Sequence, residues 1–440
     1  MTEIMLGHAP SSWSVKRLGQ LFRERKEKVN DREFPPLSVT KQGIVPQLDT
    51  AAKSDDSENR KGVRAGDFVI NSRSDRKGSS GLSDRDGSVS LINIVLEPCG
   101  VRPRFAHHLL RSPAFQEEFF RWGHGIVADL WTTRYSEMKN ILLAIPGPDT
   151  QDAVANFLDS ETARIDALIE KKERLIEISD DHWERFAFDA FSGSASPHKK
   201  ITFVGHDYLP EIPSHWTLPK LKYLSPQVTV GIVVTPAAYY VSDGISAIRA
   251  TNIRPMNLRS DDMVFISERG HRINSKSEIR SGDVLAVRTG QPGTACVVPD
   301  SLDGANCIDV ILIRKTKKYL SELLAFFLNS NSAKAQYSKG SSGAIQQHFN
   351  VSTAGNLLVP TPPLEEQEAV LRTLRQERER VSKLIRATAE SISRLHEFRS
   401  SLITAAVTGQ IDVESWGKHG GTDRRLDQIE REMMQTEARA

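Results

Sequence analysis

The stretch PLEEQEAVLRTLRQERERVSKLIRATAESISRLHEFRSSLITAAVTGQ, residues 363–410, decides how the chain folds. It contains no proline after its first residue and no glycine before Gly409, so nothing in it breaks a helix. A stripe recurs every seven residues at Leu374, Val381, Thr388, Leu395 and Leu402. This pattern predicts a long amphipathic helix with coiled-coil spacing, which needs a partner helix to cover its apolar stripe.

An internal repeat supplies that partner within the same chain. Residues 151–193, QDAVANFLDSETARIDALIEKKERLIEISDDHWERFAFDAFSG, align without a gap with residues 367–409, at an offset of 216 residues. A repeat of this length indicates two copies of one plan. We expect the two helices to pair within the chain, although pairing between chains is the alternative. The expected pairing residues are Val154, Leu158, Ile165, Leu168, Leu175, Leu374, Val381, Leu384, Leu395 and Leu402.

The repeat continues more sparsely through the two globular parts. Trp216 answers Trp13, and the turn Gly282-Asp283 follows Gly66-Asp67 at the same offset of 216 residues. Both turns lead into β-rich runs, VRAGDFVINSRS and IRSGDVLAVRTG. The sequence of the helical parts is therefore similar in the two copies, whereas the sequences of the globular parts differ.

Composition describes a globular chain with solvated helices. Of its 440 residues, 39% are hydrophobic and 26% charged, and the formal net charge is only +2. Any basic surface must therefore be local. We see no run of about 18 apolar residues and no export leader, and we expect a cytoplasmic protein. The cysteines Cys99, Cys296 and Cys307 have no metal-ligand spacing, which favours buried free thiols.

The sequence lacks the motifs of the common catalytic sites. There is no GxxxxGK[ST] phosphate loop, no methyltransferase signature and no Cys/His cluster at metal spacing. Asp149 and Asp300, each after a proline, have no following Glu-x-Lys that would complete a nuclease carboxylate set. We therefore expect a binding protein that is not an enzyme, with no catalytic residue and no metal ligand of its own.

A family resemblance accompanies this interpretation. PTPPLEEQEAV follows NLLVP, and the long helix that begins there ends in SLITAAVTGQIDV. This pattern resembles the specificity subunits of Type I restriction–modification systems. TKQGIVPQ and GISAIRATNI resemble segments of that family's target-recognition domains. The resemblance covers about residues 10–413, but the first copy, IPGPDTQDAV, lacks the second proline, the leucine and the glutamate.

The resemblance implies an α+β fold in which two β-rich target-recognition domains are joined by an intramolecular antiparallel coiled coil with a pseudo-twofold repeat. We expect target-recognition domains at 1–148 and 201–362, spacer helices at 149–191 and 363–412, a linker at 192–200 and a polar tail at 413–440 that could form a short helix. The tail could dock a partner or fray.

The family also implies partners. Each domain would read one half of a bipartite asymmetric site in double-stranded DNA, and helix length would set the half-site spacing. Two methyltransferase (modification) subunits would dock on the helices and bring S-adenosylmethionine for adenine-N6 methylation. Restriction (motor-nuclease) subunits would bring ATP and Mg²⁺. The alternatives are a stand-alone nuclease or methyltransferase with degenerate motifs, and a coiled-coil adaptor that does not bind DNA.

Polar residues in loops are the candidates for DNA contact, because loops can vary without harming a core. For the first domain they are Lys41, Gln42, Arg73, Arg76, Lys77, Trp131, Thr132, Thr133, Arg134 and Tyr135. For the second they are Arg249, Asn252, Arg288, Thr289, Gln291, Lys339, Ser341, Ser342, Gln346, Gln347 and His348. Each could instead be a solvated loop side chain, and Trp131 and Tyr135 could instead anchor their loop.

Overall fold

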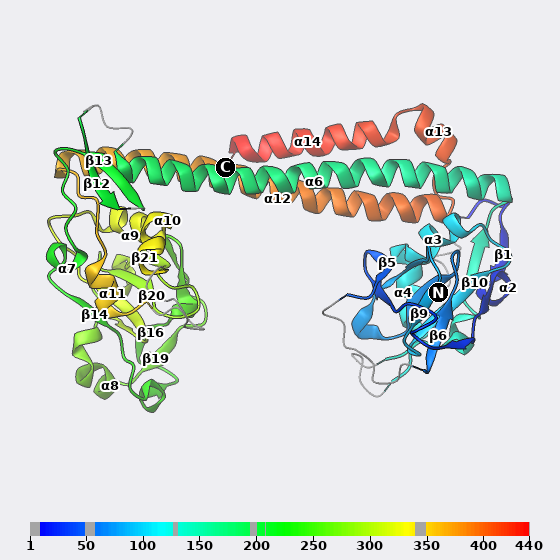
Figure 1. Cartoon of the computed structure of the whole chain (residues 1–440), viewed down its shortest axis with the longest axis horizontal. Helices are drawn as coiled ribbons and strands as arrows, with labels where there is room; N and C mark the ends of the chain where they lie inside the picture. Colours follow the sequence, from blue (N-terminus) through cyan, green and yellow to red (C-terminus); the bar gives the residue numbers. More distant parts are fainter. Residues whose placement is uncertain are drawn as a thin grey trace. The chain divides into compact units, whose positions relative to one another are not determined.

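The computed structural model describes residues 9–48, 58–125, 131–193, 200–206, 208–338 and 349–439. The chain forms two compact units: unit 1 comprises Met1–Leu175 and Ala387–Ala440, and unit 2 comprises Ile176–Arg386. Each unit contains one β-rich lobe and part of each of two long helices (Figure 1). The predicted α+β fold, with two β-rich domains joined by two long helices, is confirmed.

The two long helices are α6, Pro148–Ser192, of 45 residues, and α12, Leu364–Val407, of 44 residues. Gly193 and Gly409 follow them with φ of 71° and 74°, the left-handed conformation that commonly ends a helix. The expected second helix at 363–412 was therefore too long, because Gly409 stops α12. Most of the expected linker, residues 194–199, lies outside the described residues.

In unit 1 the first part of α6 packs against the last part of α12, so the two helices run antiparallel. Ile165 and Ile169 of α6 share one hydrophobic core with Leu395 and Leu402 of α12. The Arg399 guanidinium donates to Asp166 across the pair, with N···O distances of 2.8 and 3.0 Å. Leu168 and Leu175, expected in the contact, are only half-buried, and Ile169 is the more buried neighbour.

Unit 2 contains the reciprocal contact, between the last part of α6 and the first part of α12. Ala187 and Phe191 pack in one core with Leu371 and Leu374. His182 Nε2 lies 2.6 Å from Glu377 Oε1 across the pair. The remaining expected pairing residues divide in the same way: Val154, Leu158 and Val381 are buried, whereas Leu384 is half-buried.

The lobe of unit 1 is built on a four-stranded sheet in the order β2-β10-β7-β8. Its strands are β2 (Phe22–Glu24), β10 (Asn93–Pro98), β7 (Phe68–Asn71) and β8 (Ser80–Leu82). Beside it lie the sheet β3-β6-β9 (Lys28–Val29, Arg60–Val63, Gly87–Val89), the pair β1-β11 (Ser14–Arg17, Leu142–Ile145) and the hairpin β4-β5 (Leu37–Thr40, Gly43–Pro46). Its short helices are α2 (Leu18–Leu21), α3 (Pro103–Arg111), α4 (Pro113–Arg121) and α5 (Tyr135–Met138).

The lobe of unit 2 repeats the central sheet with the order β14-β23-β20-β21. Its strands are β14 (Val228–Val230), β23 (Val310–Ile313), β20 (Val284–Val287) and β21 (Ala295–Val297). A second sheet contains β15 (Tyr240–Val241), β19 (Val264–Ile266), β16 (Ile245–Ile248) and β22 (Asn306–Cys307), and two pairs are β12-β13 (Ile201–His206, Leu209–Pro213) and β17-β18 (Ile253–Arg254, Asn257–Leu258).

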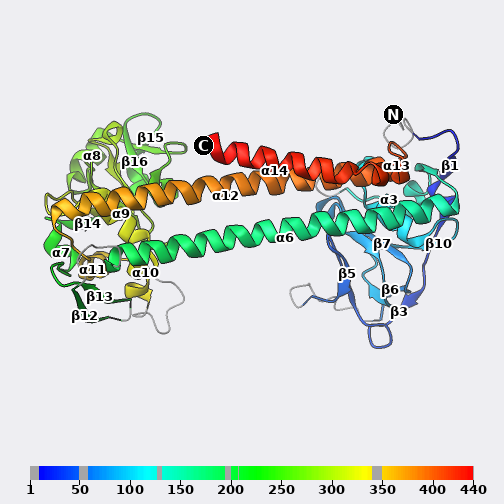
Figure 2. The ribbon, with the colours of Figure 1, turned by 90° about the horizontal axis from the view of Figure 1, so that it is seen from above.

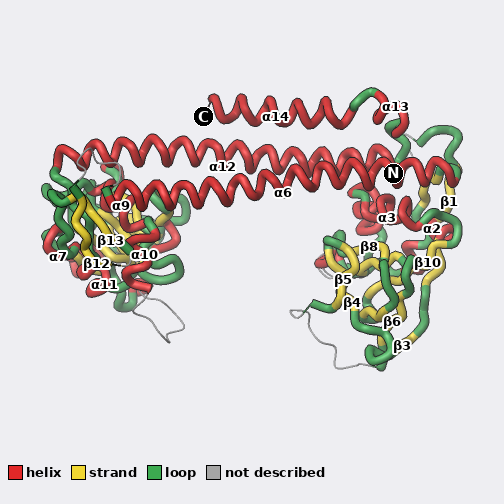
Figure 3. The backbone as a smooth tube through the Cα atoms, turned by 45° about the horizontal axis from the view of Figure 1, so that its top comes forward, coloured by secondary structure: helices red, strands yellow, loops and turns green. Residues whose placement is uncertain are grey.

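The helices of this lobe are α7 (Leu221–Leu224), α8 (Glu268–Ile273), α9 (Ser321–Asn329), α10 (Asn331–Ser338) and α11 (Val351–Asn356). Helix α9 lies between the yellow strands of the lobe and the long helices (Figure 3). Six of its consecutive residues, from Leu323 to Leu328, are buried, which is the expected pattern for a helix covered on both sides.

Three pairs of residues at the 216-residue offset make the same contacts in both units. Gln151 accepts from Arg102 N at 2.8 Å and donates to Pro146 O at 2.9 Å. Gln367 likewise accepts from Leu320 N at 2.9 Å and donates to Pro362 O at 3.0 Å. Each buried glutamine thus ties the start of a long helix to its lobe.

The other two pairs are the glycines after the helices and the aspartates of the Gly-Asp turns. A Cβ on Gly193 would lie 2.2 Å from Pro213, and one on Gly409 would lie 2.3 Å from Pro10. Asp67 accepts from Arg64 N at 2.8 Å, and Asp283 accepts from Arg280 N at 2.9 Å. The repeated residues are therefore framework contacts.

The C-terminal segment is more ordered than the expected polar tail. It forms α13 (Val413–Lys418) and the 19-residue α14 (Gly421–Arg439), which runs beside α12 (Figure 2). Ile429 is fully buried, and Glu430 Oε1 lies 2.7 Å from Nζ of the buried Lys172 on α6. A half-buried apolar face and this ion pair hold α14 on the helix pair of unit 1.

Replacing one buried leucine in each half of the helix pair tests this packing. We expect Leu395→Ala in unit 1 and Leu374→Ala in unit 2 each to lower the free energy of unfolding by about 2–5 kcal/mol, because both side chains are 0% exposed and leave a cavity. Urea denaturation followed by circular dichroism measures the loss. Leu364→Ala, at a side chain 53% exposed, is the control and should change stability by less than about 0.5 kcal/mol. Equal effects of all three would contradict the packing.

Candidate nucleic-acid interface

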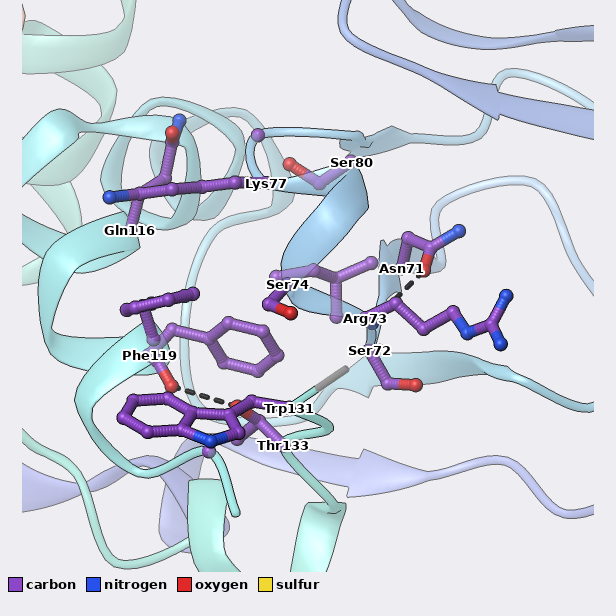
Figure 4. A pocket seen from close by; sticks show the side chains of 14 residues that line it. Asn71, Ser72, Arg73, Ser74, Lys77, Ser80, Gln116, Phe119, Trp131 and Thr133 are labelled. Carbon is purple, nitrogen blue, oxygen red and sulfur yellow. Dashed lines mark hydrogen bonds between the residues drawn. The ribbon is translucent and has the colours of Figure 1, made fainter. Parts of the chain in front are cut away.

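In the lobe of unit 1, the segment after β7 lies against the segment that begins at Trp131. Arg73 and Thr132 form an antiparallel bridge, and Ser74 N donates to Trp131 O at 2.9 Å. The predicted residue Arg73 and the predicted residues 131–135 are thereby brought together. The exposed Arg73 side chain extends away from the aromatic rings beside it (Figure 4).

Three of the predicted residues between 131 and 135 form hydrogen bonds that hold their loop in place. Trp131 Nε1 donates to Gly125 O at 3.1 Å, and Thr133 Oγ1, in a residue 3% exposed, donates to Phe119 O at 2.9 Å. The Tyr135 hydroxyl donates to Phe22 O at 2.7 Å, and burial raises its pKa. Thr133 is buried and anchors the loop from inside, whereas Trp131 and Tyr135 are half-buried and bond to the main chain, and their contact with DNA stays a prediction. Thr132 is half-buried, and Arg134 remains exposed.

The pocket in Figure 4 is a packed junction and not a ligand cavity. It is lined by residues around Arg73, Phe119 and Trp131 and leaves a space of only about 20 Å³. That volume holds about one water molecule. Its role is to fix the position of the segment that carries Arg73.

The remaining candidates of this lobe are exposed. Lys41 and Gln42 form the tip of the β4-β5 hairpin, where the Thr40 hydroxyl donates to Gly43 O at 2.9 Å. Arg76 lies 3.7 Å from Asp75, and Lys77 lies 2.5 Å from Glu117 and over the Phe120 ring. Lys77 is thus held by two partners on its own lobe.

The lobe of unit 2 places its candidates after β16 and β20. Asn252 is 1% exposed; its side chain accepts from Arg249 N at 2.9 Å and donates to Asp261 O at 3.2 Å. Its prediction as a DNA contact is therefore corrected: it shapes the turn from inside. The Arg249 guanidinium, which is half-buried, donates to Asp262 O at 2.8 Å.

Arg288 in this lobe lies close to the place that Arg73 has in the other, but the 216-residue offset pairs Arg288 with Ser72. Arg288 directly follows β20, and Arg73 lies two residues after β7. The repeated contact is one residue before Arg73: Thr133 N donates to Ser72 O, and Phe349 N donates to Arg288 O, both at 3.0 Å. Arg288 Nη1 lies 2.5 Å from Asp309, whose φ is 50°. Thr289 and Gln291 are exposed in the turn after it.

Six predicted residues cannot be placed. Lys339, Ser341, Ser342, Gln346, Gln347 and His348 lie outside the described residues. Among the residues that the structure does describe, no group of three or more His, Cys, Asp or Glu side chains could hold a metal ion, and no helix is long and apolar enough to cross a membrane. Burial raises the pKa of Cys296 and Cys307 to about 12, whereas Cys99 is exposed, contrary to the expectation of buried thiols.

A basic groove in unit 1 was not predicted. We call it the hairpin groove, because the tip of the β4-β5 hairpin forms one wall and α3 and the long helices form the others; its volume is about 650 Å³. Its lining includes Lys41, His107, Arg111 and Arg399. Three of these lie on helices, where no feature of the sequence distinguishes them from the other charged residues of a solvated face.

Comparison with known proteins gives two findings of weight. No family model matches the chain. It is 20% identical over 285 residues to the specificity subunit of the Type I restriction enzyme EcoBI of Escherichia coli; the match covers 63% of this chain and 60% of that relative's length. A chain from a structural study of complex assembly and conformational transition in a type I R-M system superposes with a TM-score of 0.64 at 18% identity, covering 92% of this chain and 99% of that one.

Two further solved structures align over most of the chain. The HsdS subunit of Thermoanaerobacter tengcongensis has a TM-score of 0.47 at 18% identity, with coverage of 92% and 98%, and the S subunit of a Type I system from M. genitalium has 0.37 at 15%, with coverage of 90% and 96%. The resemblance that the duplicated helices predicted is confirmed by the first two matches: in sequence this chain is similar to the specificity subunit of a Type I restriction enzyme, and in fold it is similar to a chain from a type I R-M system.

Proposed function

We propose that this chain is the DNA-recognition subunit of a Type I restriction–modification complex. Each β-rich lobe binds one half of a bipartite, asymmetric site in double-stranded DNA. The paired helices set the distance between the half-sites and dock the methyltransferase subunits. The chain has no catalysis of its own: S-adenosylmethionine belongs to the methyltransferase subunits, and ATP and Mg²⁺ belong to the restriction subunits.

One observation carries the proposal: the two units share their framework contacts and differ in their exposed loops. The glutamine, glycine and aspartate pairs make the same contacts at the 216-residue offset. The exposed turns after the equivalent strands β7 and β20 differ: residues 74–76 form a 3-10 helix in unit 1, whereas Thr289 and Gln291 lie in a turn with positive-φ Gly290 and Gly293 in unit 2. Recognition of a split, asymmetric DNA sequence requires this arrangement: two different DNA-binding surfaces on one repeated framework.

The helices are long enough to act as a spacer. A straight helix of the 45 residues of α6 is about 65 Å long at about 1.5 Å per residue. One turn of DNA is about 34 Å, so such a helix matches a site in which the half-sites lie about one to two turns apart. The apolar stripes of α6 and α12 are buried in both units, so the spacer is a braced pair and not a single exposed helix.

Insertion of one heptad into both helices tests the spacer role. Placed after Leu175 and after Arg386, the two insertions keep the apolar stripes in phase and lengthen the pair by about 10 Å, which is about 3 base pairs. Sequencing of methylated genomic DNA in a host that carries the variant should show the same half-sites with a longer unread spacer. Insertion into α12 alone, which puts the stripes out of register, is the control and should abolish methylation. An unchanged spacer in the double insertion would contradict the proposal.

Alanine substitution of one arginine that follows the repeated strand in each lobe tests base reading. We expect Arg73→Ala and Arg288→Ala each to weaken binding of the cognate duplex by about 1–3 kcal/mol and to relax the sequence preference in one half-site only. Gel-shift titration against duplexes with single base changes measures both effects. The control is Arg272→Ala on α8, which removes an arginine with a 70% exposed side chain from the same lobe as Arg288. Unchanged affinity and preference in either arginine variant would remove that residue from the interface.

A further inference from the structure

The hairpin groove contains two hydrogen-bond donors that face one another. His107 Nδ1 accepts from Leu82 N at 3.3 Å, so in the neutral ring the proton is on Nε2. Nε2 lies 3.4 Å from Arg111 Nη1, which is also a donor. Burial and the charge of Arg111 lower the pKa of His107 to about 4, so the ring is neutral near pH 7. Two donors this close need an acceptor between or beside them.

The acidic residues of the groove are already paired. Asp159 accepts from Arg104 Nε at 2.9 Å and lies 2.6 Å from His108 Nε2, and Asp166 pairs with Arg399. Arg111 directs its other bonds to main-chain oxygens of Lys41 and Gln42. Among the described residues, neither Arg111 nor Lys41 has a carboxylate partner within ion-pair distance.

Arg111 and Arg399 also repel one another. Burial and the charge of Arg399 lower the pKa of Arg111, although no proton leaves a guanidinium near neutral pH. Arg399 is paired with Asp166, so the uncompensated positive charge of the groove is that of Arg111 and Lys41, and it lies beside the inward-facing donors. An anionic group with several acceptor oxygens satisfies both conditions, and phosphate is the group that arginine recognises in this way.

We propose that the hairpin groove holds the phosphodiester backbone of the bound DNA. His107 Nε2–H and Arg111 donate to one phosphate, and Lys41 and Arg399 lie beside the neighbouring ones. The inference rests on the proposed function and adds a contact outside the loops, since Arg399 belongs to the long helix α12. The helix pair would then hold the DNA directly in unit 1 as well as supporting its lobe.

The size and exposure of the groove favour a polymer over a free anion. Its volume of about 650 Å³ far exceeds that of a single phosphate, and Lys41 on its rim is exposed. The hairpin tip that carries Lys41 and Gln42 forms one wall, so a backbone lying in the groove would place a DNA groove against this tip. Phosphate contacts of this kind fix the register in which base contacts are made.

The test uses the full-length chain and a duplex of mixed sequence, because phosphate binding needs no cognate site. The dissociation constant of wild type is compared with that of the double variant Lys41→Gln/Arg399→Gln between about 50 and 200 mM salt. We expect the slope of log affinity against log salt to fall by about one for each lost phosphate contact, so by about two in the double variant. The charge-conserving pair Lys41→Arg/Arg399→Lys should keep the wild-type slope.

A second variant separates hydrogen bonding from charge. His107→Phe keeps a ring of similar size and removes a neutral donor, so affinity should fall several-fold at every salt concentration while the slope stays the same. The charge-matched control is Lys418→Gln/Arg431→Gln on α13 and α14, where both side chains are exposed; α14 lies across the helix pair from the lobe of unit 1 (Figure 1). This control should not change the slope. Arg399→Gln removes the ion pair with Asp166, and His107→Phe removes the acceptor of Leu82 N, so both should lower the unfolding temperature. Circular dichroism checks that every variant is folded at the temperature of the titration.

Three outcomes would overturn the inference. If wild type binds the duplex and Lys41→Gln/Arg399→Gln keeps its slope, the groove does not hold DNA, and the proposed function stands on the loops alone. If calorimetry shows that inorganic phosphate binds wild type but not the double variant while the DNA slopes agree, the groove takes a free anion. If wild type binds no duplex at any salt concentration, the proposed function itself fails together with this inference.

Discussion

The antiparallel contact between α6 and α12 is the constraint on which the rest of the structure depends. It is made separately in each unit, by Ile165 and Leu395 in one core and by Phe191 and Leu374 in the other. Neither helix can cover its stripe alone, and each lobe uses the nearby helix segments to complete its own core. The helices are therefore part of both lobes, which explains why the compact units divide through the helices and not at their ends.

Because helix and lobe share a core, a lobe is oriented on its helices by side chains and not by a free linker. The buried glutamines at the helix starts and the crowded glycines at the helix ends fix the two junctions of each lobe. Substitution at these points would disturb the support of a lobe without touching its loops. The loops, in turn, can change without disturbing the junctions. This division allows one framework to carry two different binding surfaces.

The sequence predicted the parts of the structure that depend on local pattern. Periodicity and the absence of helix breakers gave both long helices, and the constant offset gave the repeated sheet. Periodicity reports which face of a helix is apolar but not how deeply each position is buried, so Leu168 was preferred over the more buried Ile169. The tail was underestimated for a related reason: α14 gains its stability from Ile429 and the Lys172–Glu430 pair, which are contacts between distant segments.

Loop residues were the least predictable, because a polar side chain can bond inward or outward with the same sequence around it. Asn252 and Thr133 bond inward and shape their own turns. Arg111 and His107 were missed for the reverse reason. In sequence they are ordinary residues of an amphipathic helix, and only the folded groove brings their donors together. Spacing in the sequence does not report such long-range neighbours.

Selection of bound duplexes from a random-sequence pool by the full-length chain tests the central claim most directly. Because the two lobes differ and are held on one helix pair, the chain should enrich duplexes with a split sequence. That sequence has two unrelated short blocks at one fixed separation, with no preference for the bases between them. A single continuous block, two identical blocks, or blocks whose separation varies freely would contradict the account.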